Sequence, residues 1–233
     1  MNVILCGYNW VGCKALKILI ENGHNVFVYT HESPYYIPSL VDLCNKYDIK
    51  CTTDSINNHL NVNPDIICSV YYRNIISKAV IDSCKGKIFN LHPSLLPKYR
   101  GCSSITWAMV NGEKETGYTY HYIDEGCDTG DIIYQDKIYI EDWDTQETLY
   151  MRTMFEAIKK LDYVINFVLD GKAGTKQNIE KSHYKRGCPN NGIISPDWSI
   201  DKKERFIRAM IYPPLPVATY GDKDVYHISE ISA

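Results

Sequence analysis

Residues 2–30, NVILCGYNWVGCKALKILIENGHNVFVYT, decide the fold of this chain. A short apolar run leads into two glycines five residues apart. Apolar residues then recur at helical spacing up to a glycine typical of a helix end, and a second apolar run follows. This is the pattern of two strands joined by a helix. We expect strands at Asn2–Cys6 and Val26–Thr30, with a loop over Gly7–Gly12 before the helix. This loop is either a tight strand-to-helix turn or a place where the backbone contacts a ligand, because glycine spacing alone does not separate the two.

The same alternation continues to His92. The expected elements are a helix at Ile37–Tyr47, a strand at Ile49–Thr52, a strand at Asp65–Val70, a helix at Ile76–Cys84 and a strand at Lys87–His92. Continuous apolar strands are buried on both faces, and their alternation with helices predicts an α/β fold with a doubly wound, mostly parallel sheet.

Further along the chain the strands lengthen and a loop-rich tail begins. The expected elements are strands at Gly117–Ile123 and Asp131–Ile140 around an acidic loop, a helix at Lys202–Met210 and a hairpin turning at Gly221-Asp222. A long helix is expected to begin at Asp144, with Glu147 completing a capping box, and to run to about Asp170. We therefore expect one domain over residues 1–185 and a short C-terminal tail, 186–233, that contains a β-hairpin.

Composition narrows the class of protein. The 25 basic and 28 acidic residues give a net charge of −3 without a basic stripe, which disfavours a nucleic-acid binder. No apolar run approaches the roughly 20 residues of a membrane span, and the start MNVILCGYNWVG does not resemble a signal peptide. The nine cysteines form no CxxC pair. We expect a cytoplasmic protein with reduced thiols, no membrane association and no metal site.

The strand end Phe89-Asn-Leu-His-Pro93 is the most informative stretch for chemistry. Because side chains alternate along a strand, Asn90 and His92 face the same side, and Pro93 ends the ladder beside them. An amide and an imidazole that converge on one point could stabilise an oxyanion. The alternative is a satisfied polar pair that closes a strand, and these two residues taken alone favour that alternative, because single Asn/His pairs are common.

The acidic loop Asp124–Asp131 supplies carboxylates without the spacing of a calcium loop. In a functional interpretation, one carboxylate pairs with His92 and favours its protonated form. In the alternative, the loop is a solvated turn. His121 lies in the middle of the preceding strand, and we expect it to be a packing residue.

Two segments, FNLHPSLLPKYRG (89–101) and HYIDEGCDTG (121–130), together resemble the folate-dependent formyltransferase family. The resemblance extends from residue 2 to about 220 and implies that family's Rossmann-like fold. The stretch SVYYRNII (69–76) looks most like the branch that formylates nucleotide-linked sugars, as do Phe206-Ile-Arg-Ala and Tyr212-Pro-Pro. No metal is implied, and the implied co-substrate is N10-formyltetrahydrofolate.

The resemblance also implies roles for individual residues. Asn90 would hold the formyl oxygen, His92 would be the acid–base residue, and Asp128 would orient His92. The folate pocket would be formed by two loops, whose residues are Asn74, Ile75 and Ile76 on the pterin side and Asp124, Glu125, Gly126 and Cys127 on the opposite wall. Cys102 stands where relatives carry an arginine that contacts substrate, so no role is carried over to that position.

The acceptor implied by this branch is a nucleotide-linked 4-amino sugar, with dTDP-4-amino-4,6-dideoxyglucose preferred. UDP-4-amino-4-deoxyarabinose and a dTDP-3-amino sugar are alternatives, and a non-catalytic module that binds a nucleotide or folate is the alternative of another class. The candidates for base stacking or diphosphate contacts are Trp10, Tyr184, Lys185, Arg186 and Trp198. For each of these five, ordinary packing or a solvated surface is the competing interpretation. Exposed edges of the tail hairpin suggest a homodimer.

Overall fold

The computed structural model describes residues 1–60, 63–178 and 182–231. The chain forms two compact units, which we describe separately. The first unit comprises residues 1–92, 119–135 and 155–178, and the second comprises 93–118, 136–154 and the described residues of 179–233. The boundary predicted between residues 185 and 186 falls inside the second unit.

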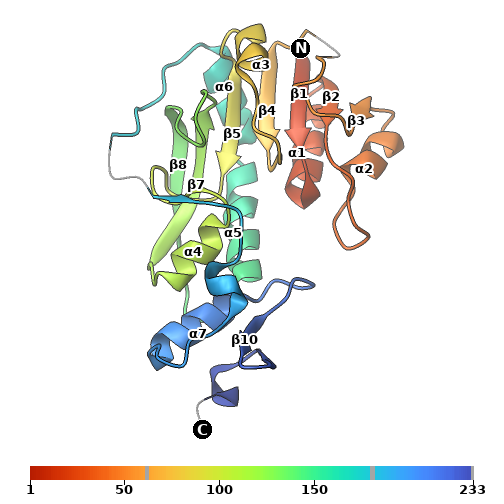
Figure 1. The fold of residues 1–233 in the computed structure, drawn as a ribbon. Coiled ribbons are helices and arrows are strands. Elements are labelled where there is room, and N and C mark those ends of the chain that lie inside the picture. Colours follow the sequence, from red (N-terminus) through yellow and green to blue (C-terminus); the bar gives the residue numbers. More distant parts are fainter. Residues whose placement is uncertain (61–62, 179–181, 232–233) are drawn as a thin grey trace. The chain divides into compact units, whose positions relative to one another are not determined.

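The first unit alternates strands and helices along the chain (Figure 1). Its elements are β1 (Asn2–Gly7), α1 (Asn9–Glu21), β2 (Asn25–Tyr29), α2 (Leu40–Lys46), β3 (Cys51–Thr52), β4 (Ile66–Val70), α3 (Lys78–Ser83), β5 (Ile88–His92) and α6 (Leu161–Leu169), with parts of β7 (Glu115–Tyr122), β8 (Ile132–Tyr139) and α5 (Gln146–Ile158). The strand order is β3-β2-β1-β4-β5-β7-β8. The pairs from β3 to β5 are parallel, and β7 is antiparallel to β5. The predicted doubly wound, mostly parallel sheet is confirmed.

Helices cover both faces of this sheet because alternate strand residues point to opposite sides. Ile88 faces a buried apolar cluster to which Val80 of α3 belongs. Its neighbour Phe89 points the other way and packs edge-to-face against Tyr120 of β7 at 5.7 Å between ring centroids. The Tyr120 hydroxyl donates to the Ala157 carbonyl in the last turn of α5 at 3.0 Å. The first unit is therefore a three-layer arrangement with the sheet in the middle.

The expected loop over Gly7–Gly12 is shorter than predicted, because α1 begins at Asn9 and only Tyr8 separates strand from helix, so the interpretation as a tight strand-to-helix turn is confirmed. A Cβ added to Gly12 would lie 3.1 Å from the carbonyl carbon of Gly7. The two glycines therefore allow the first turn of α1 to pack directly on the end of β1. They serve backbone packing, and no long binding loop exists here.

The single helix predicted from Asp144 to about Asp170 is also wrong. The chain forms α5 and then α6, with a turn at Lys159–Lys160 between them. The apolar side of α6, which includes Leu161 and Val164, is fully buried. No proline or glycine marks the break, so only the packing of α6 reveals it.

The helix cap lies one residue later than predicted. The Thr145 hydroxyl accepts from the Thr148 N–H at 3.3 Å, and the Thr148 hydroxyl accepts from the Thr145 N–H at 2.9 Å. Asp144 is instead fully buried and pairs with Arg152. A buried carboxylate needs such a partner, so Asp144 forms a buried ion pair and is not the residue that caps the helix.

The second unit holds shorter elements. They are β6 (Arg100–Gly101), α4 (Ser104–Val110), β9 (His183–Tyr184), the 3₁₀ turns η1 (Pro189–Gly192) and η2 (Ile228–Glu230), α7 (Ile200–Ala209), β10 (Ala218–Tyr220) and β11 (Lys223–Val225). The predicted hairpin is confirmed, with Gly221 in a left-handed conformation at its turn. The predicted tail helix begins two residues early because the Ser199 hydroxyl accepts from the Lys202 N–H. The helix α4 was not predicted.

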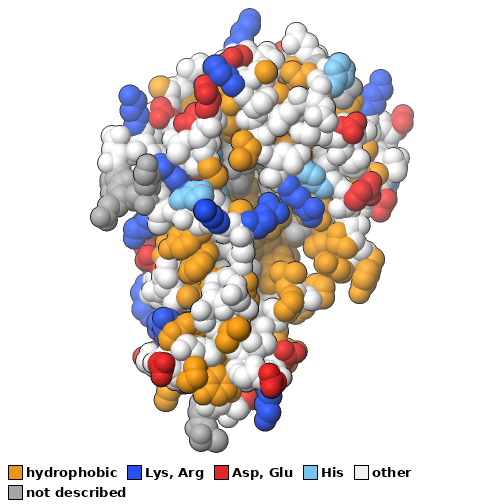
Figure 2. All heavy atoms as spheres, in the orientation of Figure 1, with side chains coloured by type: hydrophobic (Ala, Val, Ile, Leu, Met, Phe, Trp, Pro, Cys, Tyr) orange, Lys and Arg blue, Asp and Glu red, His pale blue; other side chains and the backbone are white. Residues whose placement is uncertain are grey.

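The surface is mixed in character. Positive, negative and apolar side chains all lie on the face drawn in Figure 2. Across the described residues, no helix combines the length and apolar character that a bilayer crossing requires.

Candidate active site

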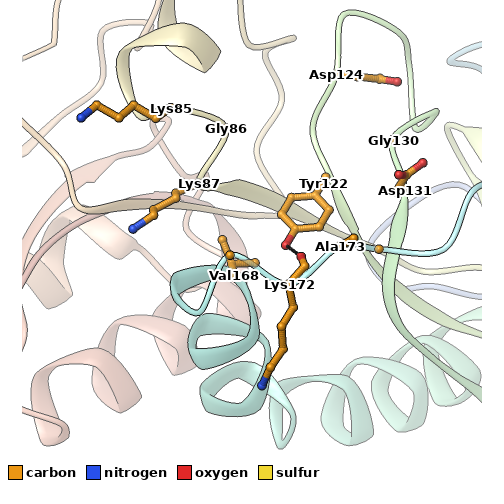
Figure 3. A pocket seen from close by; sticks show the side chains of 12 residues that line it. Lys85, Gly86, Lys87, Tyr122, Asp124, Gly130, Asp131, Val168, Lys172 and Ala173 are labelled. Carbon is orange, nitrogen blue, oxygen red and sulfur yellow. Dashed lines mark hydrogen bonds between the residues drawn. The ribbon is translucent and has the colours of Figure 1, made fainter.

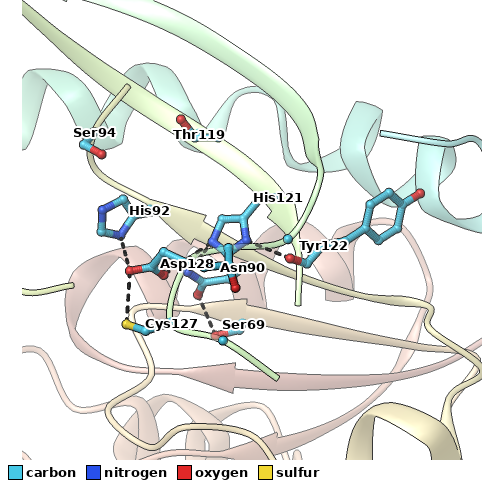
Figure 4. A network of polar contacts seen from close by, with 12 residues as sticks. Ser69, Asn90, His92, Ser94, Thr119, His121, Tyr122, Cys127 and Asp128 are labelled. Atoms are coloured by element: carbon cyan, nitrogen blue, oxygen red, sulfur yellow. Dashed lines mark hydrogen bonds and ion pairs between the residues drawn. The ribbon is translucent and has the colours of Figure 1, made fainter. Parts of the chain in front are cut away.

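Three polar side chains lie in a row across β4, β5 and β7 of the first unit (Figure 4). The strand register places Ser69 beside Asn90 and Asn90 beside His121, and directly paired residues of neighbouring strands point to the same face. The next row on this face is apolar and consists of Ile67, Ile88 and Ile123. The polar row lies at the carboxyl ends of β4 and β5, the edge at which open α/β sheets bind ligands.

Hydrogen bonds run along the whole row. The Ser69 hydroxyl donates to Asn90 Oδ1 at 2.8 Å, and Asn90 Nδ2 lies 3.2 Å from His121 Nε2. On its other side, His121 Nδ1 lies 2.7 Å from the Tyr122 carbonyl oxygen. Ser69 and His121 are both buried, so these bonds form where water does not compete for them.

His92 and Asp128 complete the cluster. His92 follows Asn90 by two residues on the same strand, so both side chains point to one face, and His92 is buried. Its Nδ1 lies 3.5 Å from Asp128 Oδ2, and the other carboxylate oxygen lies 3.5 Å from His121 Nε2. The structure therefore brings Asn90, His92 and Asp128 together. His121, expected to be only a packing residue, belongs to the same cluster, as does Ser69.

The loop that carries Asp128 is shaped by its own side chains. Asp124 Oδ1 accepts from the Gly126 N–H at 3.1 Å and from the Thr129 hydroxyl at 2.6 Å. A Cβ added to Gly126 would lie 2.0 Å from the Thr129 hydroxyl oxygen. Asp124, predicted to wall the folate pocket, thus uses its carboxylate to hold this loop in shape.

Gln177 fixes the same loop from outside it. Its Nε2 donates to the main-chain carbonyls of Asp128 at 3.0 Å and Gly130 at 2.7 Å. Asp128 itself has a left-handed φ of +53°, an unfavourable conformation that its surroundings must maintain. Sequence reasoning missed Gln177, because a glutamine far along the chain carries no motif.

The predicted pterin-side loop is held by another missed residue, Asn57. Its Nδ2 donates to the Ile75 carbonyl at 2.8 Å, and its Oδ1 accepts from the Ser77 N–H at 2.8 Å. The Ile75 side chain is 75% exposed, whereas Ile76 is buried in the core cluster under α3. Asn74 donates to the Tyr72 hydroxyl at 3.3 Å. Burial raises the pKa of Tyr72 above its usual range, so this phenol stays neutral.

The two predicted folate loops leave the sheet as neighbours. Ile76 and Ile123 pack in the same apolar cluster, and Lys78 Nζ lies 3.4 Å from Glu125 Oε1. The carboxylates of Asp82 and Glu125 raise the pKa of Lys78. Cys127 is exposed, and its thiol lies 3.6 Å from Asp128 Oδ2.

An aromatic group lies where the strand order reverses, between β1 and β4. Tyr8 stacks on Tyr71 at 6.4 Å between ring centroids, and the Arg73 guanidinium lies 4.4 Å from the Tyr8 ring centroid. The main-chain N–H of Arg73 donates to His31 Nε2 at 3.1 Å. These contacts define the shape of the Tyr71–Ile75 loop.

The residues predicted to bind the nucleotide are divided between the units. Trp10 lies in the first turn of α1 in the first unit. The other four, in the second unit, are Tyr184, Lys185, Arg186 and Trp198. Tyr184 stacks with Trp107 at 4.5 Å and with Tyr99 at 5.6 Å, and Trp198 packs on Phe206 at 5.0 Å. Tyr184 and Trp198 thus contribute to packing, whereas Lys185 and Arg186 are exposed.

A separate pocket of about 500 Å³ lies beside the amino end of β5 (Figure 3). It is lined by Lys85, Gly86, Lys87, Tyr122, Asp124, Gly130, Asp131, Val168, Gly171, Lys172, Ala173 and Gly174. Of these, only Asp124 belongs to the predicted site. Within the described ranges, no three His, Cys, Asp or Glu side chains are grouped to hold a metal ion.

Comparisons with known proteins point to one family. The family model described as formyl transferase matches residues 14–165. A GDP-perosamine N-formyltransferase of Brucella melitensis biotype 1 is 37% identical over 98% of this chain and 92% of its own length. WlaRD, a sugar 3N-formyl transferase solved in the presence of dTDP and 5-N-formyl-THF, matches with a TM-score of 0.85 at 24% identity, over 97% of this chain and 85% of that one.

A second solved structure is PseJ of Anoxybacillus kamchatkensis, a formyltransferase in complex with UDP-4,6-dideoxy-4-formamido-L-AltNAc and tetrahydrofolate. It is 29% identical with a TM-score of 0.59, over 79% of this chain and 86% of that one. The resemblance drawn from residues 89–101 and 121–130 is confirmed. The chain belongs to the formyl transferase family.

Proposed function

We propose that this protein transfers a formyl group from N10-formyltetrahydrofolate to the amino group of a nucleotide-linked 4-amino sugar. The observation that carries the proposal is the convergence of Asn90, His92 and Asp128 at the carboxyl end of β5, within 3.5 Å between His92 and Asp128. The relatives support it, because one is named a GDP-perosamine N-formyltransferase and another is a formyltransferase solved in complex with UDP-4,6-dideoxy-4-formamido-L-AltNAc. A module that only bound a nucleotide would have no chemical use for this polar cluster.

The residues present fit a folate. The apolar side chain of Ile75 is exposed on one loop and Cys127 is exposed on its neighbour, which suits a flat aromatic ring system held between them. The loop at Ile75 is fixed in advance by Asn57. When bound, N10-formyltetrahydrofolate supplies the formyl carbon that the acceptor amine attacks.

The side chains have distinct chemical tasks in this proposal. An amide nitrogen carries two hydrogens, and one N–H of Asn90 donates to the formyl oxygen as negative charge develops there. Asp128 faces Nδ1 of His92, so it keeps a proton on that nitrogen and leaves Nε2 as the atom that exchanges protons with the reactants. The proton lost by the attacking amine and the proton gained by N10 are therefore both assigned to His92, directly or through water.

Two acceptors deserve the first test. Sequence reasoning favours dTDP-4-amino-4,6-dideoxyglucose, whereas the relative at 37% identity is named for GDP-perosamine. The nucleotide and the sugar both differ between them. UDP-4-amino-4-deoxyarabinose serves as a third arm of the comparison.

The test is mass spectrometry of reactions that contain the protein, N10-formyltetrahydrofolate and each acceptor in turn. We expect one acceptor to gain one CO and tetrahydrofolate to form in equal amount. The His92→Ala variant, which we expect to bind folinic acid as the wild type does, is the control. Binding of folinic acid without transfer to any of the three acceptors would contradict the proposed 4-amino-sugar activity.

A further inference from the structure

Asn90 is held from both sides by residues to which the proposed chemistry gives no task. Ser69, on β4, forms a hydrogen bond with the side-chain oxygen of Asn90. His121, on β7, forms one with the side-chain nitrogen of Asn90. We propose that Ser69 and His121 are positioning residues that fix the Asn90 carboxamide with one N–H directed at the formyl oxygen. This inference rests on the proposed function above.

The proton positions in the row follow from the Tyr122 carbonyl. A carbonyl oxygen cannot donate, so the 2.7 Å contact requires that His121 Nδ1 carries a hydrogen. In the neutral ring, Nε2 then has a lone pair and no hydrogen, so Asp128 Oδ1, which also lies 3.5 Å from Nε2, forms no hydrogen bond there. The group that faces Nε2 at 3.2 Å must donate, and for Asn90 that group is Nδ2.

Ser69 holds the other end of the amide. Its hydroxyl donates to Asn90 Oδ1 at 2.8 Å. If the amide turned over, Oδ1 would face the lone pair of His121 Nε2, and two acceptors would oppose each other. With the amide held in this orientation, one of the two hydrogens on Nδ2 points to His121 Nε2, and the second is left for the substrate. A turned amide would present an oxygen to the developing oxyanion and would repel it.

Packing alone does not account for a serine at this position. Ser69 is the polar residue of the strand Ile66–Val70, whose other side chains are all apolar and buried. A buried hydroxyl is costly unless it is bonded, and the bond here goes to Asn90. The next row on this face pairs His92 with Thr119. There the Thr119 hydroxyl accepts from the side-chain amide of Gln135 on β8 at 2.7 Å.

The test is a double-mutant cycle on kcat. If Ser69 acts through Asn90, Ser69→Ala should lower kcat about 5- to 10-fold in the wild type, the loss of one hydrogen bond, with KM within about twofold. The same substitution in an Asn90→Ala background should have no further effect. Ser69→Thr keeps the hydroxyl and should restore most of the rate.

A matched control removes a buried hydroxyl outside the row. Thr153 is fully buried, and its hydroxyl donates to the Leu149 carbonyl at 2.7 Å. Thr153→Val should leave kcat unchanged. An equal loss of kcat from Ser69→Ala in both Asn90 backgrounds would overturn the proposal, and so would an unchanged kcat in the single variant.

A second measurement does not depend on turnover. The two side-chain hydrogens of Asn90 are observed by ¹⁵N NMR and assigned by their loss in Asn90→Ala. In the wild type, the hydrogen that faces His121 Nε2 should exchange with solvent more slowly than the other side-chain hydrogen of Asn90. This difference in exchange rate should shrink in Ser69→Ala. Identical exchange in both proteins would refute the positioning role. A clear difference in a protein that transfers no formyl group would instead refute the proposed function and retain the positioning role.

Discussion

The side-chain amide of Gln177 donates a 3.0 Å hydrogen bond to the main-chain carbonyl of Asp128. The same nitrogen bonds Gly130 at 2.7 Å. These bonds hold the carboxylate of Asp128 in place through its backbone, although Gln177 is 49 residues away in sequence.

Loss of this clamp, the two hydrogen bonds from Gln177, should therefore impair catalysis more than stability. Gln177→Leu keeps the size of the side chain and removes both bonds. We expect kcat to fall about tenfold, the effect of one to two hydrogen bonds, with a small decrease in Tm. Lys176→Leu, at the exposed neighbouring residue, is the control and should leave kcat unchanged. If the two variants have the same activity, the clamp has no role in orienting Asp128.

Asn90 and His92 should be needed for rate rather than for binding. Removal of an oxyanion donor costs on the order of 10²–10³ in kcat, and we expect that loss for Asn90→Ala. For His92→Ala we expect a loss of roughly 10²–10⁴, the usual contribution of an acid–base group. Steady-state kinetics and calorimetric titration with folinic acid separate the two effects. Dissociation constants raised more than tenfold would indicate that these side chains serve mainly in binding.

Cys127 should report on the folate loops by its reaction with iodoacetamide. It is exposed beside Asp128, so bound folinic acid should protect it from alkylation. Cys188 is also exposed but lies in the second unit, and its labelling should not change. Burial raises the pKa of Cys13 to about 11, so it should react slowly near pH 8, where roughly one thiol in a thousand is ionised. Peptide mass spectrometry measures all three sites, and equal labelling of Cys127 with and without folinic acid would argue against the proposed pocket wall.

His24 should make the protein less stable in mild acid. Burial, and then the nearby N-terminal amino group, lower the pKa of His24, with a smaller opposing effect from Asp162. The unfolded chain therefore binds a proton more readily than the folded one. The free energy of unfolding should decrease as the pH falls through the unfolded value of about 6.5. Urea unfolding should show a weaker decrease for His24→Gln, and His59→Gln, at an exposed histidine, should behave as the wild type does.

Local sequence patterns predicted the parts of this fold that depend on local physics. The parallel strands up to His92 were visible because buried strands are continuous apolar runs, and the hairpin at Gly221 because its turn needs a left-handed residue. The break at Lys159–Lys160 was not visible. It depends on how α6 packs, and the two lysines are good helix formers.

The candidate site shows the same limit. The shared face of Asn90 and His92 followed from strand alternation. The place of His121 followed from the register between β5 and β7, which no local pattern encodes. Gln177 and Asn57 act through the backbone of distant loops, so their side chains carry no recognisable motif. The family resemblance gave Asp128 its role before its position was known.

The row of Ser69, Asn90 and His121 has a consequence for how this protein tolerates insertions and deletions. One residue added to or removed from β7 would shift its pairing with β5 by one position and turn every side chain beyond that point to the other face. A bulky tyrosine, Tyr120 or Tyr122, would then stand where His121 now meets Asn90. Natural or engineered changes in chain length should therefore be confined to the connections between strands, because the length of β7 determines which side chain lies opposite Asn90.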